Sequence, residues 1–342
     1  MTEGQAAGLR PHTRFTLGFA SGAMPGSLVI LCGTALGPYG LGLLSAGVLG
    51  SFDPAMPVAL AALGVFVGIQ FNLRIQRDWQ ALAAASLQAG VTMGIVGAGV
   101  VLLAQLWAAA LQPPAWFNGV VLAIGAADGP LPVLLGGVAL AFLRDALPGA
   151  AAMLVLEATG VTLAIAVAGW LLLSQSAEGP ERRIFVIALL LLLGGASDYL
   201  SLSALTGGLI AGVLWEAADG STRKAIWRDL LYVQRPLIVL ILVVSGARLE
   251  MTPLVLAIGL PFLALRLLGS MAGSAAAQHL FPGWQPADTL TSLSPGIVGL
   301  AFALSAVRAA GPDAATVLSV VVVGAVGSEL LAPILAPRGK VE

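Results

Sequence analysis

Apolar stretches of about 20 residues recur along almost the whole chain, separated by short segments that contain Gly, Pro and charged residues. A helix of about 20 residues is long enough to cross the roughly 30 Å hydrocarbon core of a bilayer. Only 10% of the residues are charged, whereas soluble domains have about 25%. The pattern therefore predicts an all-helical, polytopic membrane protein with almost no soluble domain.

Eleven apolar runs are candidates for helices, with boundaries that sequence reading fixes only to within a few residues. They cover residues 15–37, 55–73, 80–107, 116–143, 148–174, 183–197, 200–216, 229–247, 252–278, 286–310 and 314–336.

The 16 Lys and Arg residues indicate how these runs are oriented, because short cytoplasmic loops are enriched in them. With eleven crossings, the basic loops that follow 55–73 and 200–216 would fall on opposite sides of the membrane. One extra or missing crossing between 148–174 and 200–216 removes this conflict, and the short run between them is the doubtful one. We therefore expect ten or twelve crossings, both termini in the cytoplasm, and Arg248 and Arg308 on the outer side.

The chain divides into two halves that repeat the same order of features. The runs 55–73 and 229–247 both end in a Gly followed by alternating apolar and polar residues. The predicted parts are an N-terminal tail (1–14), a first repeat (15–174), a linker (175–199), a second repeat (200–337) and a C-terminal tail (338–342). The crossing number argued above makes the two repeats inverted.

The fourth helix of each repeat is interrupted, by Asp128-Gly129-Pro130 in the first and by Ser294-Pro295-Gly296 in the second. Proline lacks an N–H and clashes with the preceding turn, so both helices should open there. Broken segments at corresponding positions of two repeats point to the binding site of a transporter near the membrane midplane. The expected fold is two inverted five-helix repeats with crossed broken helices.

Glu157 lies about ten residues from either end of the run 148–174, where a charged side chain costs about 2.5 to 3.5 kcal/mol on insertion scales. A carboxylate there can hold a proton or a dehydrated monovalent cation, but not both at once. Asp128, at the helix break, is a second candidate ion ligand, or else a cap for the second half of its helix.

Arg266, near the middle of the run 252–278, cannot release its proton at physiological pH. It can neutralise Glu157, Asp128 or the negative helix ends at the crossing, or it forms a structural ion pair. Gln88 and Thr159 could complete a coordination shell, although ordinary hydrogen bonding between helices explains both.

Gly90 and Gly94 have the small-x-x-x-small spacing that lets membrane helices approach closely, as do Gly208 and Gly212. The single Cys32 excludes internal disulfides and cysteine metal clusters. No catalytic motif is present, so we expect neither an enzyme nor a cofactor. The net charge of -1 gives no indication of nucleic-acid binding.

An ordered series of segments resembles monovalent cation:proton antiporters of the potassium-efflux and sodium/proton exchanger type. The segments are Gly33–Gly42, Asp128–Pro130, Leu156–Gly160, Leu202–Leu214 and Arg266–Gly269. In this comparison Glu157 stands at the family's essential carboxylate and Arg266 where the family has a membrane-embedded Lys or Arg. The chain differs from the family pattern at Ala127, where Thr is usual, and at Leu156, where a polar residue is usual.

The resemblance implies exchange of Na⁺ or K⁺ for H⁺ by alternating access, in a homodimer with a dimerisation side and a core side. The expected location is the cell (inner) membrane, and any regulation would come from a separate subunit. Because Leu156 leaves one titratable group at this position, the simplest stoichiometry is electroneutral. Two alternatives remain: a sodium-coupled symporter for an organic anion, and a non-transporting membrane scaffold or sensor.

Overall fold

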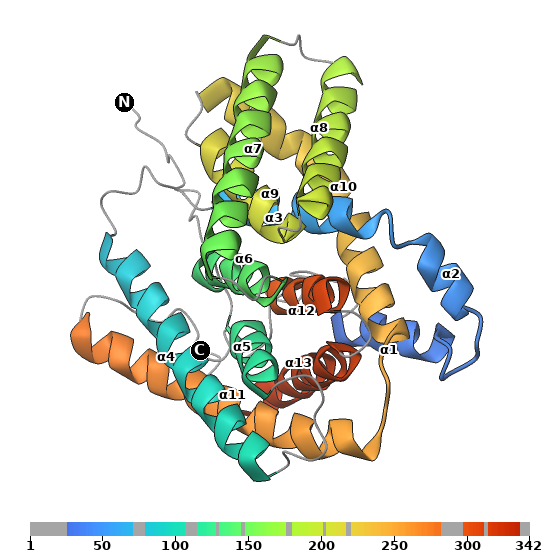
Figure 1. The fold of residues 1–342 in the computed structure, drawn as a ribbon, viewed down its shortest axis with the longest axis vertical. Helices are drawn as coiled ribbons and strands as arrows, with labels where there is room; N and C mark the ends of the chain where they lie inside the picture. Colours follow the sequence, from blue (N-terminus) through green and yellow to red (C-terminus); the bar gives the residue numbers. More distant parts are fainter. Residues whose placement is uncertain are drawn as a thin grey trace, which may run out of the picture.

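The computed structural model describes residues 26–70, 79–106, 115–127, 130–144, 148–175, 180–200, 203–216, 220–281, 297–310 and 314–335 (Figure 1). Within these ranges the protein is helical and contains no strand. The helices are α1 (Gly26–Leu36), α2 (Ala46–Ser51), α3 (Met56–Gln70), α4 (Trp79–Leu106), α5 (Ala115–Ala126), α6 (Pro130–Arg144), α7 (Pro148–Gln175), α8 (Pro180–Tyr199), α9 (Ala204–Glu216), α10 (Gly220–Ala247), α11 (Pro253–Leu280), α12 (Ile297–Ala310) and α13 (Ala315–Leu335).

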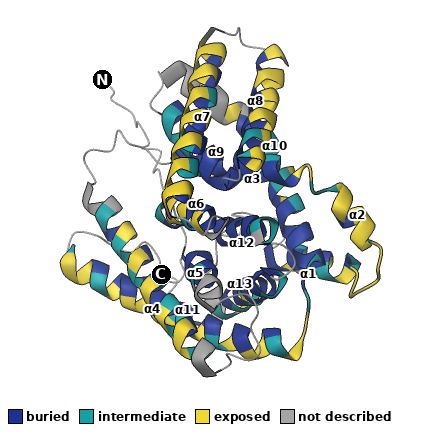
Figure 2. Cartoon of the chain, in the orientation of Figure 1, coloured by how far each residue is buried: buried dark blue, intermediate teal, exposed yellow. Residues whose placement is uncertain are grey.

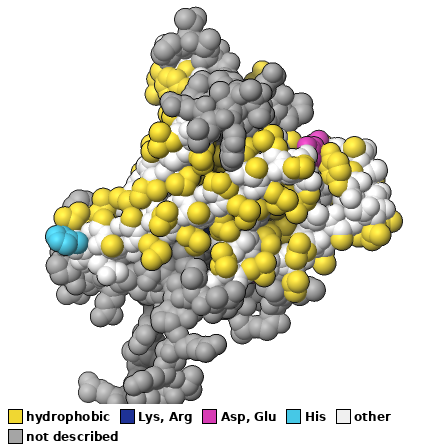
Figure 3. Space-filling model, turned by 90° about the horizontal axis from the view of Figure 1, so that it is seen from below, with side chains coloured by type: hydrophobic (Ala, Val, Ile, Leu, Met, Phe, Trp, Pro, Cys, Tyr) yellow, Lys and Arg dark blue, Asp and Glu magenta, His cyan; other side chains and the backbone are white. Residues whose placement is uncertain are grey.

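Three helices, α4, α7 and α11, contain segments long and apolar enough to cross a membrane. Several shorter helices are equally apolar along their length. The outer surface agrees with this composition, because many side chains of the described residues on the face in Figure 3 are hydrophobic. Exposed apolar residues also line α7, α8 and α11, as the yellow ribbons of Figure 2 show. The described fold is all-helical and is consistent with a helical membrane protein.

The predicted interruption of the run 116–143 is present. Helix α5 ends at Ala126 and α6 begins at Pro130, while Asp128 and Gly129 lie outside the described residues. Pro130 is the first residue of its helix, where a missing N–H costs no hydrogen bond. In the second half α12 begins at Ile297, and Ser294, Pro295 and Gly296 lie outside the described part.

The linker region contains a full helix, because α8 spans 20 residues and is antiparallel to its neighbour α7 in Figure 1. Helix α10 also begins nine residues before the predicted run 229–247. Both extensions are polar at their first turns, which reading apolar runs cannot detect.

Glycines bring two pairs of helices into backbone contact. A Cβ on Gly64 or Gly68 of α3 would clash with the backbone at Leu205 or Leu209 of α9. The contact residues advance in the same direction along both helices, so α3 and α9 are parallel. The contacts of Gly33 with Val243 and of Gly37 with Ala247 make α1 and α10 parallel in the same way.

The two interfaces have the same register. Gly33 of α1 abuts the carbonyl of Val243, and Gly246, three residues after Val243, abuts the carbonyl of Ile30. In the other pair, Gly212 of α9 abuts the carbonyl of Val65, and Gly68, three residues after Val65, abuts the carbonyl of Leu209. Each of these four glycines thus has a counterpart in the opposite half of the chain.

The predicted close approach at Gly208 and Gly212 is confirmed, because added Cβ atoms would meet the α3 backbone. The same prediction for Gly90 and Gly94 is wrong for the described structure: both lie on α4, and no atom of the described residues lies within 4 Å of an added Cβ. The spacing is identical, but these two glycines lie away from the α11 contact of α4, which uses Thr92 and Gln88.

We expect Gly212→Ala to lower the thermal stability of the detergent-solubilised protein, because overpacking of a tight contact costs about 1–3 kcal/mol. Gly94→Ala is the matched control, and it should be neutral or slightly stabilising, since alanine favours helix over glycine by about 1 kcal/mol. Thermal unfolding monitored by intrinsic tryptophan fluorescence measures both. Equal effects of the two substitutions would contradict the close packing of α3 and α9.

Candidate functional site

Arg266 occupies the middle of α11 and is only 2% exposed. Its Nε donates a hydrogen bond of 3.0 Å to the carbonyl oxygen of Ala126, and its Nη1 donates one of 3.3 Å to Ser328 Oγ on α13. The Ser328 hydroxyl in turn donates to the carbonyl of Gly324, at 2.7 Å. One buried cation therefore joins α11, α5 and α13.

The Ala126 carbonyl explains why a cation is buried here. Ala126 is the last residue of α5, so its carbonyl has no partner in its own helix. The C-terminal end of a helix also carries partial negative charge, which a guanidinium neutralises. The sequence suggested several partners for Arg266, and one of them was the negative end of a helix at the break. The hydrogen bond to Ala126 is a contact of that kind.

The break lies where α5 crosses α12. A Cβ on Gly299 of α12 would clash with the carbonyl oxygen of Gly125 of α5. Only glycine therefore allows the two backbones to approach this closely, one residue before Ala126. Asp128 follows Ala126 by two residues, and its own side chain lies outside the described residues.

Glu157 lies in the middle of α7 on its exposed side, next to Leu156, which is 70% exposed. In the described part of the chain it has no hydrogen bond or ion pair, and it is not brought together with Arg266. Helix α7 packs against α6, α8 and α9, whereas α11 packs against α4 and α13. The pairing of Glu157 with Arg266, one of the possibilities raised by the sequence, is therefore absent from the described residues.

The buried stripe of α7 explains this orientation. Ala158, Thr162 and Ala166 are buried at helical spacing. The indole of Trp215 on α9 donates a hydrogen bond of 2.9 Å to the Ala166 carbonyl, which fixes the rotation of α7. Thr159 is half-buried at the edge of this stripe.

Gln88 forms the interhelical hydrogen bond that its sequence position suggested. Its Nε2 donates to Ser274 Oγ of α11 at 3.0 Å, and Thr92 Oγ1 donates to the Gln88 carbonyl at 2.8 Å. Ser270 and Ser274 follow Arg266 at four-residue intervals, and both are buried. The contact between α4 and α11 is thus a polar stripe that continues from Arg266.

Ser328 and the pair Ser203 and Ser305 were not predicted as site residues. Ser203 Oγ donates to Ser305 Oγ at 3.3 Å, and each of Ser305 and Ser328 also bonds a carbonyl of its own helix. Serines in apolar helices commonly make such bonds to the preceding turn. No pattern in the sequence separates these serines from others of the same kind.

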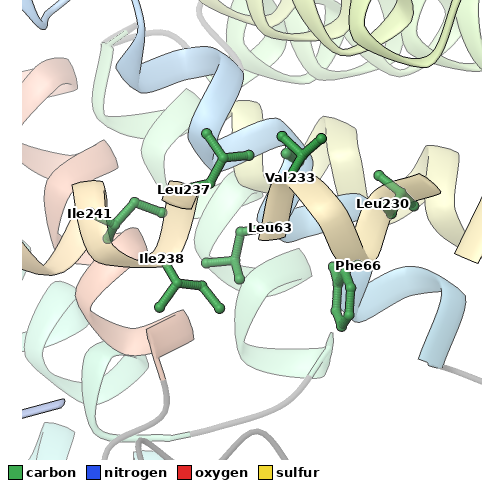
Figure 4. A pocket seen from close by; sticks show the side chains of 8 residues that line it. Leu63, Phe66, Leu230, Val233, Leu237, Ile238 and Ile241 are labelled. Atoms are coloured by element: carbon green, nitrogen blue, oxygen red, sulfur yellow. The ribbon is translucent and has the colours of Figure 1, made fainter. Parts of the chain in front are cut away.

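A cavity between α3 and α10 has a purely apolar lining (Figure 4). Its walls are Ala62, Leu63, Phe66, Leu230, Val233, Leu237, Ile238 and Ile241. It offers no ligand to a cation. Within the described ranges, no group of three or more His, Cys, Asp or Glu residues could hold a metal ion.

The chain matches no protein-family model and no curated protein sequence.

We expect Ser328→Ala to lower the free energy of unfolding by about 1–3 kcal/mol, because it removes an acceptor from a buried guanidinium. Ser245→Ala is the control, since Ser245 is buried but its hydroxyl donates only to Ile241 of its own helix. Thermal unfolding in the same detergent compares the two. The assigned Arg266 contact would be wrong if both variants lost the same stability.

Proposed function

We propose that this protein is a secondary active transporter that exchanges a monovalent cation, Na⁺ or K⁺, for H⁺ by alternating access. The observation that carries the proposal is the interrupted helix α5–α6, which crosses α12 at Gly125 and Gly299 while buried Arg266 binds its free carbonyl end. Interrupted helices with compensated ends form the ion sites of transporters with repeated folds.

Helix directions support two inverted repeats. Asp53, just before α3, is ion-paired with Arg248, just after α10, so α3 starts where α10 ends. Helix α10 is parallel to α1, and α3 is parallel to α9. It follows that α1 and α9, the first helices of the two halves, run in opposite directions. The matching register of the glycine contacts supports the same relation.

Asp128 and Glu157 are the proposed ion and proton ligands. A carboxylate binds either a proton or a monovalent cation, and this competition is sufficient to couple the two fluxes. Arg266 keeps its charge and supports the site without carrying a proton. With one exchanging carboxylate, one cation replaces one proton and the cycle is electroneutral.

The organic-anion symporter is the less favoured alternative. Such a protein requires a larger polar cavity, and the cavity between α3 and α10 is lined by apolar side chains alone. We further propose that the protein works as a homodimer in the cell (inner) membrane, with both termini in the cytoplasm. A separate subunit would supply any regulation.

The proposal is tested with purified protein in liposomes that contain a pH-sensitive dye. Addition of Na⁺, K⁺ or Li⁺ should dissipate a preset pH gradient. Glu157→Gln should abolish the response and Asp128→Asn should slow it by about tenfold or more, because neither amide can exchange a proton. Glu181→Gln removes a carboxylate from the exposed first turn of α8 and should leave the rate unchanged.

The wild-type protein must respond to at least one of these cations at some pH between about 6 and 9. No response to any of them would refute the antiporter and favour the scaffold or sensor. Dissipation that depends on an organic anion would favour the symporter.

The stoichiometry is a separate prediction. If one proton exchanges for one monovalent cation, no net charge moves, and the exchange rate should not change when an ionophore imposes a membrane potential. A rate that follows the potential would contradict electroneutral exchange but not the antiport itself.

A further inference from the structure

Ten of the described helices pack into two groups, which meet along a boundary. Helices α1, α3, α8, α9 and α10 form the first group, and the glycine contacts hold two pairs of them together. Helices α4, α5, α11, α12 and α13 form the second. Helix α12 lies at the boundary, where it contacts α9 and α10 and where α6 lies beside it in Figure 1.

Polar contacts cross this boundary at the end of α12. Arg308 Nη1 donates to the carbonyl of Asp53 at 2.6 Å, and Nη2 lies 2.8 Å from Asp198 Oδ1 near the end of α8. The Glu250 amide donates to Ser319 Oγ of α13 at 3.1 Å across the same end. There too the Glu250 carboxylate raises the pKa of Tyr39, by hydrogen bonding and by its charge.

Buried hydroxyls continue inward from Arg308. Ser305 is one turn before Arg308 on α12 and accepts the hydrogen bond of Ser203. Thr206, one turn further along α9, donates to the Val133 carbonyl of α6 at 3.1 Å. Ser197 is 1% exposed beside Gly207, and its Oγ has no hydrogen-bond partner in the described structure. We call Ser197, Ser203, Thr206 and Ser305 the hydroxyl seam.

The hydroxyl seam leads towards the helix break. Six residues before Ser305, Gly299 crosses Gly125, next to the Ala126 carbonyl that binds Arg266. Phe302 lies between Gly299 and Ser305 on α12, and its ring packs against Gly136 of α6. The stronger link is through Thr206, because its partner Val133 is only three residues after Pro130, the first residue of α6 at the helix break. The hydroxyl seam thus extends from the Arg308 end of the bundle to the first turn of α6.

We propose that the hydroxyl seam is the access route by which a monovalent cation or proton reaches the helix break from this end, and that Arg308 closes the route by binding Asp198 and Asp53. The proposal rests on the proposed antiport function. Neutral hydroxyl oxygens suit a partly dehydrated monovalent cation, and water entering the seam would satisfy the Ser197 hydroxyl. The ion pair is half-exposed, so opening it costs little.

The test measures access to the seam directly. Ser305→Cys is introduced into a Cys32→Ser background, and the protein in lipid nanodiscs is labelled with a charged, membrane-impermeant maleimide. Adding Arg308→Gln should increase the labelling rate roughly two- to fivefold, the range expected for loss of a partly exposed ion pair. Asp198→Asn should give a similar increase, and the charge swap Arg308→Asp with Asp198→Arg should restore slow labelling.

Glu181→Gln is the matched control, because Glu181 lies in the exposed first turn of α8, at the opposite end of that helix from Asp198. It should leave the labelling rate unchanged. An unchanged rate in both Arg308→Gln and Asp198→Asn, or an equal increase in Glu181→Gln, would overturn the proposal. If Arg308→Gln does not fold, the labelling rate of Asp198→Asn alone tests the proposal.

Labelling requires no transport, so the two proposals fail separately. An Arg308-dependent labelling rate in a protein that exchanges no cation would refute the antiporter and retain a gated route. Cation exchange without any effect of Arg308 or Asp198 on labelling would support the antiporter and refute the gated route.

Discussion

A carbonyl that loses its helical partner inside a bilayer has no water to bond, and the arrangement around Arg266 follows from this constraint. The end of α5 leaves the Ala126 carbonyl free, and the Arg266 guanidinium binds it. Burying that cation requires a second acceptor, which Ser328 supplies from α13. The approach of α12 to the same point requires glycine at Gly125 and Gly299. Helices α11, α12 and α13 thus all meet at the end of α5, where one backbone carbonyl lacks a partner in its own helix.

The glycine interfaces solve a different problem. Between membrane helices there is no hydrophobic driving force, so close backbone packing must stabilise the contact. The pairs α1–α10 and α3–α9 achieve this with glycines in one shared register. In contrast, side-chain hydrogen bonds and an ion pair join α12 to its neighbours across the boundary. Contacts of that kind are individually weak, so the boundary can change while each glycine-packed pair stays intact.

The sequence predicted what depends on local chemistry. Apolar runs located α3, α4 and α7 to within a few residues, and Asp128-Gly129-Pro130 located the break. It did not predict what depends on helix rotation. Gly94 and Gly212 share one spacing pattern, yet only Gly212 faces a neighbour. Glu157 is central along α7, but the Trp215 bond and the buried alanine stripe turn it away from Arg266. Position along a helix fixes depth, whereas tertiary packing fixes direction.

Gln88 and Arg266 are each twenty residues after the glycines Gly68 and Gly246, which have equivalent contacts in the two halves. In the proposed repeat they are therefore counterparts, one neutral and one permanently charged. Gln88 bonds Ser274 of α11, whereas Arg266 holds the end of α5. Two cations at these positions would repel each other across the contact of α4 with α11 and would double the cost of burying charge. A single fixed cation avoids this repulsion and leaves the carboxylates as the groups whose charge can change, as exchange of one cation for one proton requires.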